Sequence, residues 1–333
     1  MEEYKLSVAS SPHASSPVGT KNLMRDVLIA LIPAMAMGIY VFGPRALTTT
    51  LVSVIFCEIF EWGYCKLMHK PNPVGDLSAC VTGVILALNM PVSMPLWIAI
   101  VGALVAIVII KQLFGGLGYN FANPALVGRI VLFLGFTSRM TAYVYPDMSV
   151  DALASATPLN AAVDLHSVSF VDMLLGIHGG MMGETCVIAI LLGLAYLLFT
   201  HTIEFTIPAS IVGTMYVLTL LATRDPYIAL LDCMSGGLLF GAVFMATDYV
   251  TSPNTPKGEV IFGIGAGLLV VFIRYFGGYP EGVCYSILIM NICVWLIDKA
   301  TLPKRFGVTA EMRKAEKEKA KAAKKAAKEG AEA

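Results

Sequence analysis

Ten apolar segments constrain the fold of this chain more than any other feature. They lie at about 24–42, 46–65, 77–90, 95–113, 124–137, 184–200, 207–222, 231–248, 259–276 and 282–298. A helix that crosses a bilayer needs about 20 mostly apolar residues. Only 14% of the chain is charged, whereas a soluble domain carries about 25%. We therefore predict an all-α polytopic membrane protein with about ten transmembrane helices, which excludes a stand-alone soluble enzyme.

The third and eighth apolar segments predict an internal repeat. Each is third in its set of five, each is interrupted or preceded by turn residues, and each has an aspartate, Asp76 or Asp248, near one end. Short or broken spans at matching positions are typical of inverted repeats. We expect two inverted five-helix repeats, at 24–137 and 184–305. Coincidence is the alternative, because glycine and proline are common in membrane helices.

Lysine and arginine positions predict the orientation in the membrane. With ten spans, nineteen of the 23 basic residues fall on the side of the two termini. The other side receives Arg45, Arg139, Arg224 and Arg274. By the positive-inside rule, the N-terminal segment 1–23 and the tail 306–333 are cytoplasmic in a bacterial-type inner membrane. The segment 138–183 between the two repeats then faces outward.

The tail from about residue 308 alternates alanine, lysine and glutamate. This pattern indicates a charged, solvated helix that helps solubility or contacts a partner. Glutamates separate the lysines, which argues against nucleic acid as that partner.

The polar segment between the apolar halves contains the run from Asp151 to Leu159, with sequence DALASATPL. Three small residues, Ala154 to Ala156, leave the hydroxyl of Thr157 accessible to a modifying enzyme. Pro158 favours an extended backbone at Thr157 rather than a helix. The run therefore favours Thr157 as a site of covalent attachment, and an ordinary Ser/Thr/Pro loop is the alternative.

Cysteine and histidine patterns do not indicate a metal site. The seven cysteines form no C-x-x-C pair, and the five histidines are dispersed. We interpret the cysteines as small buried hydrophobic residues, with an iron–sulfur cluster built from scattered cysteines as the alternative. No Rossmann G-x-G-x-x-G and no cysteine-rich ferredoxin pattern is found in the sequence.

The charged residues at membrane depth include five that we consider for an ion pathway. Glu58 and Glu61 are three apart on the second segment and share a helix face. Asp76 and Asp248 lie at the predicted cytoplasmic ends of the third and eighth segments, and Arg129 lies one turn inside the fifth. Ionisable residues inside a membrane mark ion pathways by default, so Glu58, Asp76, Arg129 and Asp248 are candidates. The alternative is that Glu61, Asp76 and Asp248 cap their helices and face water, while Arg129 or Glu58 pairs within the bundle.

Three segments resemble a known family. They are Ser11-Pro12-His13, the stretch from Gly118 to Arg129 (GYNFANPALVGR) and Ser155 to Leu159. They resemble the D subunit of the Rnf electron-transport complex, and the resemblance extends from about residue 11 to about 305. The same superfamily includes the B subunit of the sodium-pumping NADH:quinone oxidoreductase. That subunit usually has a longer N-terminal extension, so the first apolar segment near residue 24 favours the Rnf subunit.

The resemblance implies a ten-helix fold of two inverted repeats and an FMN joined to Thr157 by a phosphoester bond. A separate flavin transferase makes this bond and recognises roughly D-x-x-[ST]-[GS]-A-T. Asp151, Ser155, Ala156 and Thr157 match that pattern. Ala154 departs from it, because the family often has serine or threonine there. Arg139 and the hydroxyl side chains of the loop are candidates to meet the flavin phosphate, with a membrane-edge anchor as the alternative for Arg139.

The resemblance also implies a larger complex. Its other subunits, which carry iron–sulfur clusters and flavins, exchange electrons between ferredoxin and NAD while the complex moves Na+ or H+. This subunit is then not catalytic alone. Some members of the family hold a second, non-covalent flavin, riboflavin or FMN, among the helices.

Two other functions remain open from the residues themselves. One is the B-type subunit of a Na+-translocating NADH:quinone oxidoreductase, which adds a quinone site. The other is a flavin-free secondary transporter, because inverted repeats and broken helices are typical of transporters. The run around Thr157 distinguishes the transporter from the flavin-bearing subunits, since a plain transporter has no use for it.

Overall fold

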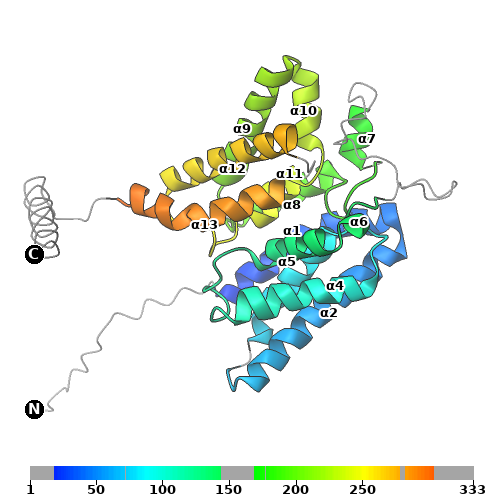
Figure 1. The fold of residues 1–333 in the computed structure, drawn as a ribbon, viewed down its shortest axis with the longest axis vertical. Coiled ribbons are helices and arrows are strands. Elements are labelled where there is room, and N and C mark those ends of the chain that lie inside the picture. The colour runs from blue at the N-terminus through cyan, green and yellow to red at the C-terminus, as the bar shows by residue number, and fades with distance from the viewer. Residues whose placement is uncertain (1–18, 72, 144–168, 177, 278–281, 304–333) are drawn as a thin grey trace, which may run out of the picture.

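A computed structural model describes residues 19–71, 73–143, 169–176, 178–277 and 282–303. Within these ranges all regular structure is helical (Figure 1). The elements are α1 (Thr20–Phe42), α2 (Pro44–Leu67), η1 (Val74–Asp76), α3 (Ser78–Leu88), α4 (Leu96–Leu104), η2 (Val105–Gln112), α5 (Pro124–Gly135), α6 (Thr137–Met140), α7 (Phe170–Leu175), α8 (Val187–Phe199), α9 (Thr206–Thr223), α10 (Pro226–Met234), α11 (Leu238–Phe240), η4 (Gly241–Met245), α12 (Pro256–Phe276) and α13 (Val283–Thr301). Element η1 is a 3-10 turn, whereas η2 and η4 are π-helical and continue α4 and α11.

Five helices, α1, α2, α9, α12 and α13, are long and apolar enough to cross a bilayer. Helix α10 and the α11–η4 segment pass the same test together but meet at an angle of 62°. Shorter apolar helices are α3, α4 with η2, α5 and α8. The prediction of an all-α polytopic membrane protein is therefore confirmed.

The third helix of each half is short or broken. Helix α3 has 11 residues and so spans only about 16 Å of a roughly 30 Å hydrocarbon core. In the second half, the chain bends between Met234 and Leu238, where Gly236 has a φ of +65°. A residue with a side chain is strained at that φ, whereas glycine is not. The break was expected from the Ser235-Gly236-Gly237 sequence, but α10 begins at Pro226, earlier than the expected 231.

Three helices begin with a polar cap followed by proline. Asn123 accepts hydrogen bonds from the backbone N–H groups of Ala125 and Leu126 at the start of α5. Asp225 does the same at the start of α10, and Thr255 accepts one from Gly258 at the start of α12. Each cap satisfies an N–H group without a helical partner, and proline has no N–H to satisfy. These starts therefore follow from local sequence.

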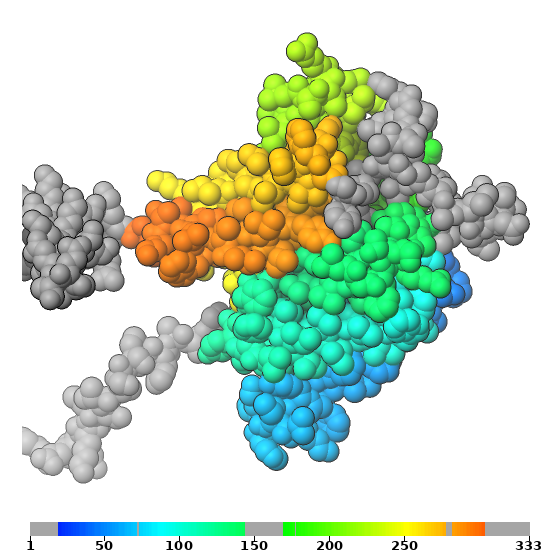
Figure 2. Space-filling view, in the orientation of Figure 1, coloured from blue at the N-terminus to red at the C-terminus, as the bar shows by residue number. Residues whose placement is uncertain are grey.

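The helices form two groups that pack in corresponding ways. In the first group, α2 packs on α3 and α4, and α4 packs on α5; in the second, α9 packs on α10 and α12, and α12 packs on α13. The groups meet where α1 packs on α8 and α5 packs on α13. Figure 1 shows the first group in blue to teal and the second in lime to orange. In Figure 2, α13 lies directly along the first group.

Glycines allow the backbones of the two groups to approach closely. A Cβ on Gly193 of α8 would lie 2.5 Å from the carbonyl oxygen of Ala30 in α1. A Cβ on Gly38 of α1 would lie 2.6 Å from the carbonyl oxygen of Met182. Small residues at such contacts are a common means of packing membrane helices.

Residues 178–186 enter the protein between the two groups and are buried. The N–H of Gly183 donates to the carbonyl of Leu88 at 2.8 Å, and that of Met182 donates to Met90 at 3.3 Å. These bonds satisfy backbone groups at the end of the short helix α3, as irregular backbone at membrane depth requires. The end of the expected outward segment 138–183 is thus an internal element.

Candidate functional site

A group of acidic and basic side chains, buried at Glu61, Ser78 and Lys111 and half-buried at Glu58 and Asp76, lies at one end of the first half. We call it the first-half cluster; it consists of Glu58 and Glu61 of α2, Asp76 of η1, Ser78 of α3 and Lys111 of η2. The Lys111 ammonium is 2.5 Å from Glu61 Oε1 and 2.5 Å from Ser78 Oγ. The side chains of Lys111 and Glu61 are only 2% and 0% exposed.

The turn between η1 and α3 positions the acidic end of the cluster. Asp76 accepts from the backbone N–H of Ser78 at 2.8 Å, and the Ser78 hydroxyl also donates to Asp76. Leu77 between them has a φ of +66°. Strained backbone of this kind in a residue other than glycine is frequent at functional sites. Ser78 thereby connects Lys111 to Asp76.

Glu61 is held by a second polar partner, because Gln112 Nε2 donates to Glu61 Oε1 at 2.7 Å. Lys111 and Gln112 both belong to the π-helical segment η2, a conformation that is often found at functional sites. The remaining carboxylate oxygen, Oε2, of both Glu58 and Glu61 is buried without a hydrogen-bond partner. The predicted shared face of these two residues is confirmed, whereas the interpretation of Glu61 as a water-facing cap is wrong.

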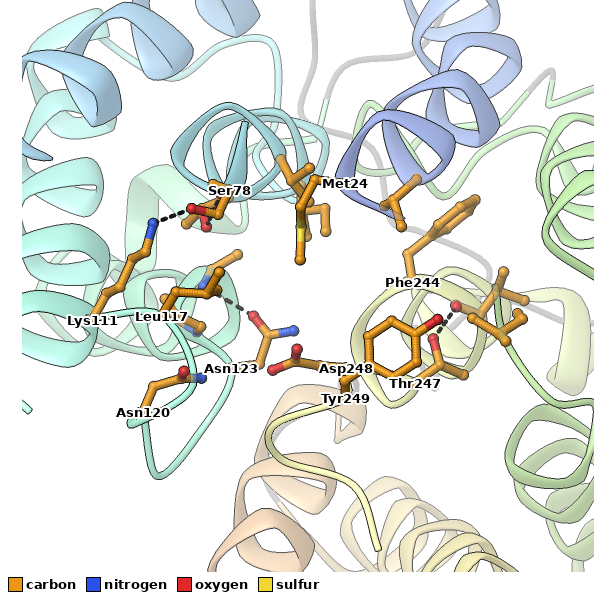
Figure 3. Close-up of a pocket in the computed structure, with 18 of the residues that line it drawn as sticks. Met24, Ser78, Lys111, Leu117, Asn120, Asn123, Phe244, Thr247, Asp248 and Tyr249 are labelled. Carbon is orange, nitrogen blue, oxygen red and sulfur yellow. Dashed lines mark hydrogen bonds between the residues drawn. The ribbon is translucent and has the colours of Figure 1, made fainter. Parts of the chain in front are cut away.

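A cavity of about 80 Å³ separates the two halves beside this cluster. We call it the junction cavity. Its walls come from the first half (α1, α3, η2, α5) and the second half (α8, η4), as Figure 3 shows. The volume exceeds the roughly 10–15 Å³ that a single water needs. The cavity is therefore large enough for a small ligand or several waters.

Asp248, Asn120 and Asn123 contribute polar groups to the cavity wall, as do Ser78 and Lys111. Asn123 Nδ2 donates to the carbonyl of Met245 at 3.2 Å and so joins the halves. Burial raises the pKa of the Asp248 carboxyl above its usual range, although hydrogen bonds from Thr251 and Asn120 oppose the shift. Asp248 follows the end of η4, so it lies in a loop rather than inside the expected helix.

Arg129 lies in a separate buried site at the break of the second half. Its Nη1 donates to Cys284 Sγ of α13 at 2.7 Å. A Cβ on Gly237 would lie 3.8 Å from Arg129 Nη1 and 3.1 Å from Glu184 Oε2. The absence of a side chain at Gly237 thus leaves room for both charged groups. Arg129 is 4% exposed, which agrees with the expectation that it lies inside the bundle.

A buried ion pair in the second half joins Asp232 of α10 to Arg274 of α12. Arg274 Nη1 is 2.9 Å from Asp232 Oδ1 and also donates to the Asp232 carbonyl at 2.7 Å. Its Nη2 donates to the carbonyl of Ser235 at 3.0 Å. Thr219 of α9 donates to the other carboxylate oxygen of Asp232.

The structure brings Asp76 and Glu58 into one cluster and places Asp248 on the nearby cavity, but Arg129 is apart from them. Arg139 is exposed on α6. The attachment-site residues Asp151, Ser155, Ala156 and Thr157 lie outside the described residues, as does Ala154. In the described ranges no group of three or more His, Cys, Asp or Glu side chains is arranged to hold a metal ion.

Sequence reasoning missed four buried charged residues: Lys111, Glu184, Asp232 and Arg274. Lys111 and Arg274 were counted as loop charges in the orientation analysis, although both fall within expected spans. A basic residue inside a span is itself a signal of a buried acidic partner.

Comparison with known proteins identifies the family. A sequence model described as the NQR2, RnfD, RnfE family matches residues 7–307. The D subunit of the Na(+)-translocating ferredoxin:NAD(+) oxidoreductase complex from Acetobacterium woodii is 43% identical over 93% of this chain and 98% of its own length. The D subunit of the proton-translocating ferredoxin:NAD(+) oxidoreductase complex from Clostridium ljungdahlii is 39% identical over 90% and 96%. The D subunit of an ion-translocating oxidoreductase complex from Actinobacillus pleuropneumoniae is 34% identical over 90% and 98%. The chain belongs to the NQR2, RnfD, RnfE family.

Proposed function

We propose that the chain is the D subunit of an ion-translocating ferredoxin:NAD+ oxidoreductase complex and relays electrons through an FMN attached to Thr157. The observation that carries this proposal is the near full-length similarity to relatives named as that subunit. The chain acts within the complex and is not catalytic alone. Its partners are the iron–sulfur and flavin subunits, a flavin transferase for maturation, and the lipid bilayer.

The attachment proposal rests on the residues of the motif. Thr157 supplies the hydroxyl for a phosphoester, and Asp151, Ser155 and Ala156 are the residues that the transferase would recognise. The exposed guanidinium of Arg139 on α6 is available for the phosphate. A flavin exchanges electrons singly or in pairs, and the protein supplies its position and electrostatics.

We further propose ten spans in two inverted repeats. The start of α1 and the end of α8 both line the junction cavity, as do the start of α3 and the end of η4. This arrangement supports opposite directions for the corresponding helices of the two halves, as an inverted repeat requires. The charge distribution supports cytoplasmic termini, an extracytoplasmic Thr157 and insertion into a bacterial inner membrane.

The ion pathway is proposed to pass the first-half cluster and the junction cavity, through Glu58, Asp76 and Asp248, with Arg129 deeper in the bundle. Moving one charge against 100 mV costs about 2.3 kcal/mol. Coupling must therefore be tight, and buried charged side chains near a cavity suit a controlled path. The relatives are named for different ions, Na+ and the proton, so the ion has to be measured.

A second, non-covalent flavin (riboflavin or FMN) is also proposed. The junction cavity combines apolar walls at Val81, Ile85 and Phe244 with the amides of Asn120 and Asn123. Apolar surface for a ring and a few polar groups for its edge are what a cofactor site needs, but such sites have about 300–1,000 Å³ and the junction cavity has about 80 Å³. The cavity would have to widen to admit a flavin, so this proposal rests on the family resemblance. Flavin released from the denatured wild-type complex, in addition to the covalent one, would support it.

In-gel flavin fluorescence tests the central proposal. The denatured chain, expressed with an active flavin transferase, is compared with Thr157→Ala and with a matched control, Thr141→Ala, whose exposed hydroxyl lies at the end of α6. We expect a fluorescent band in wild type and Thr141→Ala and none in Thr157→Ala. A dark wild-type band beside a transferase that labels another substrate would contradict the proposal and favour a transporter. Oxidation of NADH by the purified single chain would contradict the proposal that the chain is not catalytic without the other subunits.

A further inference from the structure

The first-half cluster contains more negative than positive charge. The charged groups that act on the Glu58 carboxylate are Glu61, Lys111 and Asp76. Among the described residues, three carboxylates thus share one ammonium. Taking unpaired charges out of water costs several kcal/mol each. Glu61 is fully buried and Glu58 and Asp76 are half-buried, so a further cation or a proton at the cluster would offset its excess negative charge.

Two carboxylate oxygens indicate where a further cation would bind. Glu61 is fully buried and uses only Oε1, which accepts from Lys111 and Gln112. Its Oε2, like Glu58 Oε2, is enclosed without a hydrogen-bond partner. Buried oxygens that carry negative charge are normally paired or coordinate a cation. A small cation bound to these oxygens would satisfy both groups.

The junction cavity gives a ligand access to the cluster. Lys111 and Ser78 belong both to the cluster and to the cavity wall. Figure 3 shows the two side chains joined at one edge of the cavity, with Asp248 on another side. An ion in the cavity therefore meets the Lys111 ammonium before it reaches Glu61. Lys111 stands where it can compete with that ion.

We propose that Lys111 is a tethered counter-cation whose ammonium competes with a small monovalent cation from the junction cavity for the carboxylates of Glu61 and Glu58. Lysine suits this role because its ammonium is a compact point charge on a flexible four-carbon stem. When the cation binds, the ammonium moves away from Glu61, and when the ammonium returns, the cation is released. The inference rests on the proposed ion-translocating function and adds a residue that sets the affinity for the ion.

Two substitutions of Lys111 change the competition in opposite directions. Lys111→Gln removes the competing charge and keeps a hydrogen-bonding side chain. Lys111→Arg keeps a permanent charge and adds a planar fork that binds carboxylates with two hydrogen bonds. The matched control is Lys66→Gln, because Lys66 lies on α2 near Glu61 but is exposed over the ring of Trp62.

The experiment uses the whole complex in proteoliposomes. The rate of ferredoxin-dependent NAD+ reduction is measured against Na+ concentration at several pH values, with ion uptake measured in parallel. We expect Lys111→Gln to lower the half-saturating cation concentration about tenfold or more, because a full charge is removed within contact distance. We expect Lys111→Arg to raise it by a similar factor, and Lys66→Gln to leave it unchanged.

The dependence of the rate on Na+ concentration and its dependence on pH distinguish Na+ from the proton. A shift of the Na+ midpoint assigns Na+ to the site, and a shift of the pH midpoint at saturating Na+ assigns the proton. Unchanged midpoints in both Lys111→Gln and Lys111→Arg would overturn the inference. If Lys111→Gln does not assemble, Lys111→Arg alone decides it.

Failure of the inference and failure of the proposed function are distinguishable. The flavin content of the chain and the electron transfer rate of the detergent-solubilised complex report the relay through Thr157 without an ion gradient. A complex that keeps both but shows no shift of cation affinity in the Lys111 variants would retain its function and lose the competition mechanism.

Discussion

Lys111 in the first half and Arg274 in the second half occupy corresponding places but are held in different ways. Each lies near the C-terminal end of the fourth helix of its half, and each pairs with a carboxylate, Glu61 or Asp232. Arg274 is fixed by two backbone carbonyls as well as its carboxylate. Among the described residues, the Lys111 ammonium is held by the side chains of Glu61 and Ser78 and by no backbone carbonyl.

The charge balance of the two sites differs as well. Asp232 and Arg274 form a one-to-one pair, and Thr219 satisfies the remaining carboxylate oxygen. The first-half cluster has three carboxylates for one lysine. Corresponding positions in the two halves thus hold a structural ion pair, Asp232 with Arg274, in the second half and a proposed cation-exchanging site, at Lys111, in the first. Variants of Arg274, Lys111, Ser78 and Ser235 test that distinction.

The largest expected effect is the loss of Arg274. Arg274→Gln leaves Asp232 charged and buried, and removing one partner of a buried pair costs about 3–5 kcal/mol. We expect a large drop in the thermal midpoint of the purified complex, with no recovery when NaCl is added. In Lys111→Gln, by contrast, added cation should restore part of the lost stability, because a ligand that binds only the folded state stabilises it.

Choline chloride at equal concentration is the control for ionic strength in that comparison. Equal losses in Arg274→Gln and Lys111→Gln, with no cation-specific recovery in either, would show that both sites are ordinary structural ion pairs.

The next effect concerns the contact that holds the two halves together. Gly193→Ala places a Cβ 2.5 Å from a backbone oxygen of α1, and overpacking of this kind costs about 1–3 kcal/mol. Gly213→Ala on α9 is the matched control, since a Cβ there meets nothing within 4 Å. We expect a lower thermal midpoint for Gly193→Ala and an unchanged or higher one for Gly213→Ala. The reverse order would mean that α1 and α8 do not pack as described.

A smaller effect distinguishes the serines of the two sites. Ser78→Ala removes the hydroxyl that joins Lys111 to Asp76, a loss of about 1 kcal/mol per hydrogen bond. Ser235→Ala keeps the carbonyl that Arg274 uses. We expect Ser78→Ala to change the half-saturating cation concentration of the complex and Ser235→Ala to leave it unaltered. A shift in both variants would argue against a special role for the first half.

The smallest effect is a pH dependence from His178 in the inserted segment. Burial lowers the pKa of His178 below its usual value of 6.5. Below that pH the unfolded chain takes up a proton that the folded chain excludes, so stability falls as the pH decreases, by at most about 1.4 kcal/mol per pH unit. His178→Gln should flatten this slope in thermal scans between pH 7 and 5. An unchanged slope would show that His178 is not the source of the acid sensitivity.

The fold class could be predicted because apolar segments and helix caps are local features. Ten apolar segments correspond to the helical segments observed, and the starts at Asn123-Pro124 and Thr255-Pro256 follow from cap chemistry. Glu58 and Glu61 share a face because helical periodicity places residues three apart together. Residues 151–157, on which the flavin prediction rests, lie outside the described residues, so that prediction stays a prediction.

The sequence by itself determined the membrane class and a third helix that is short in the first half and broken in the second, and it nominated Glu58, Asp76, Arg129 and Asp248 as candidates. Only the tertiary structure decided that Lys111 is buried, because its partners Glu61 and Ser78 lie 50 and 33 positions away. The sequence did not predict the pairing of Asp232 with Arg274 for the same reason, because the two residues are far apart along the chain. Segment periodicity reports which face of a helix is apolar, whereas the balance of buried charge depends on which helices meet.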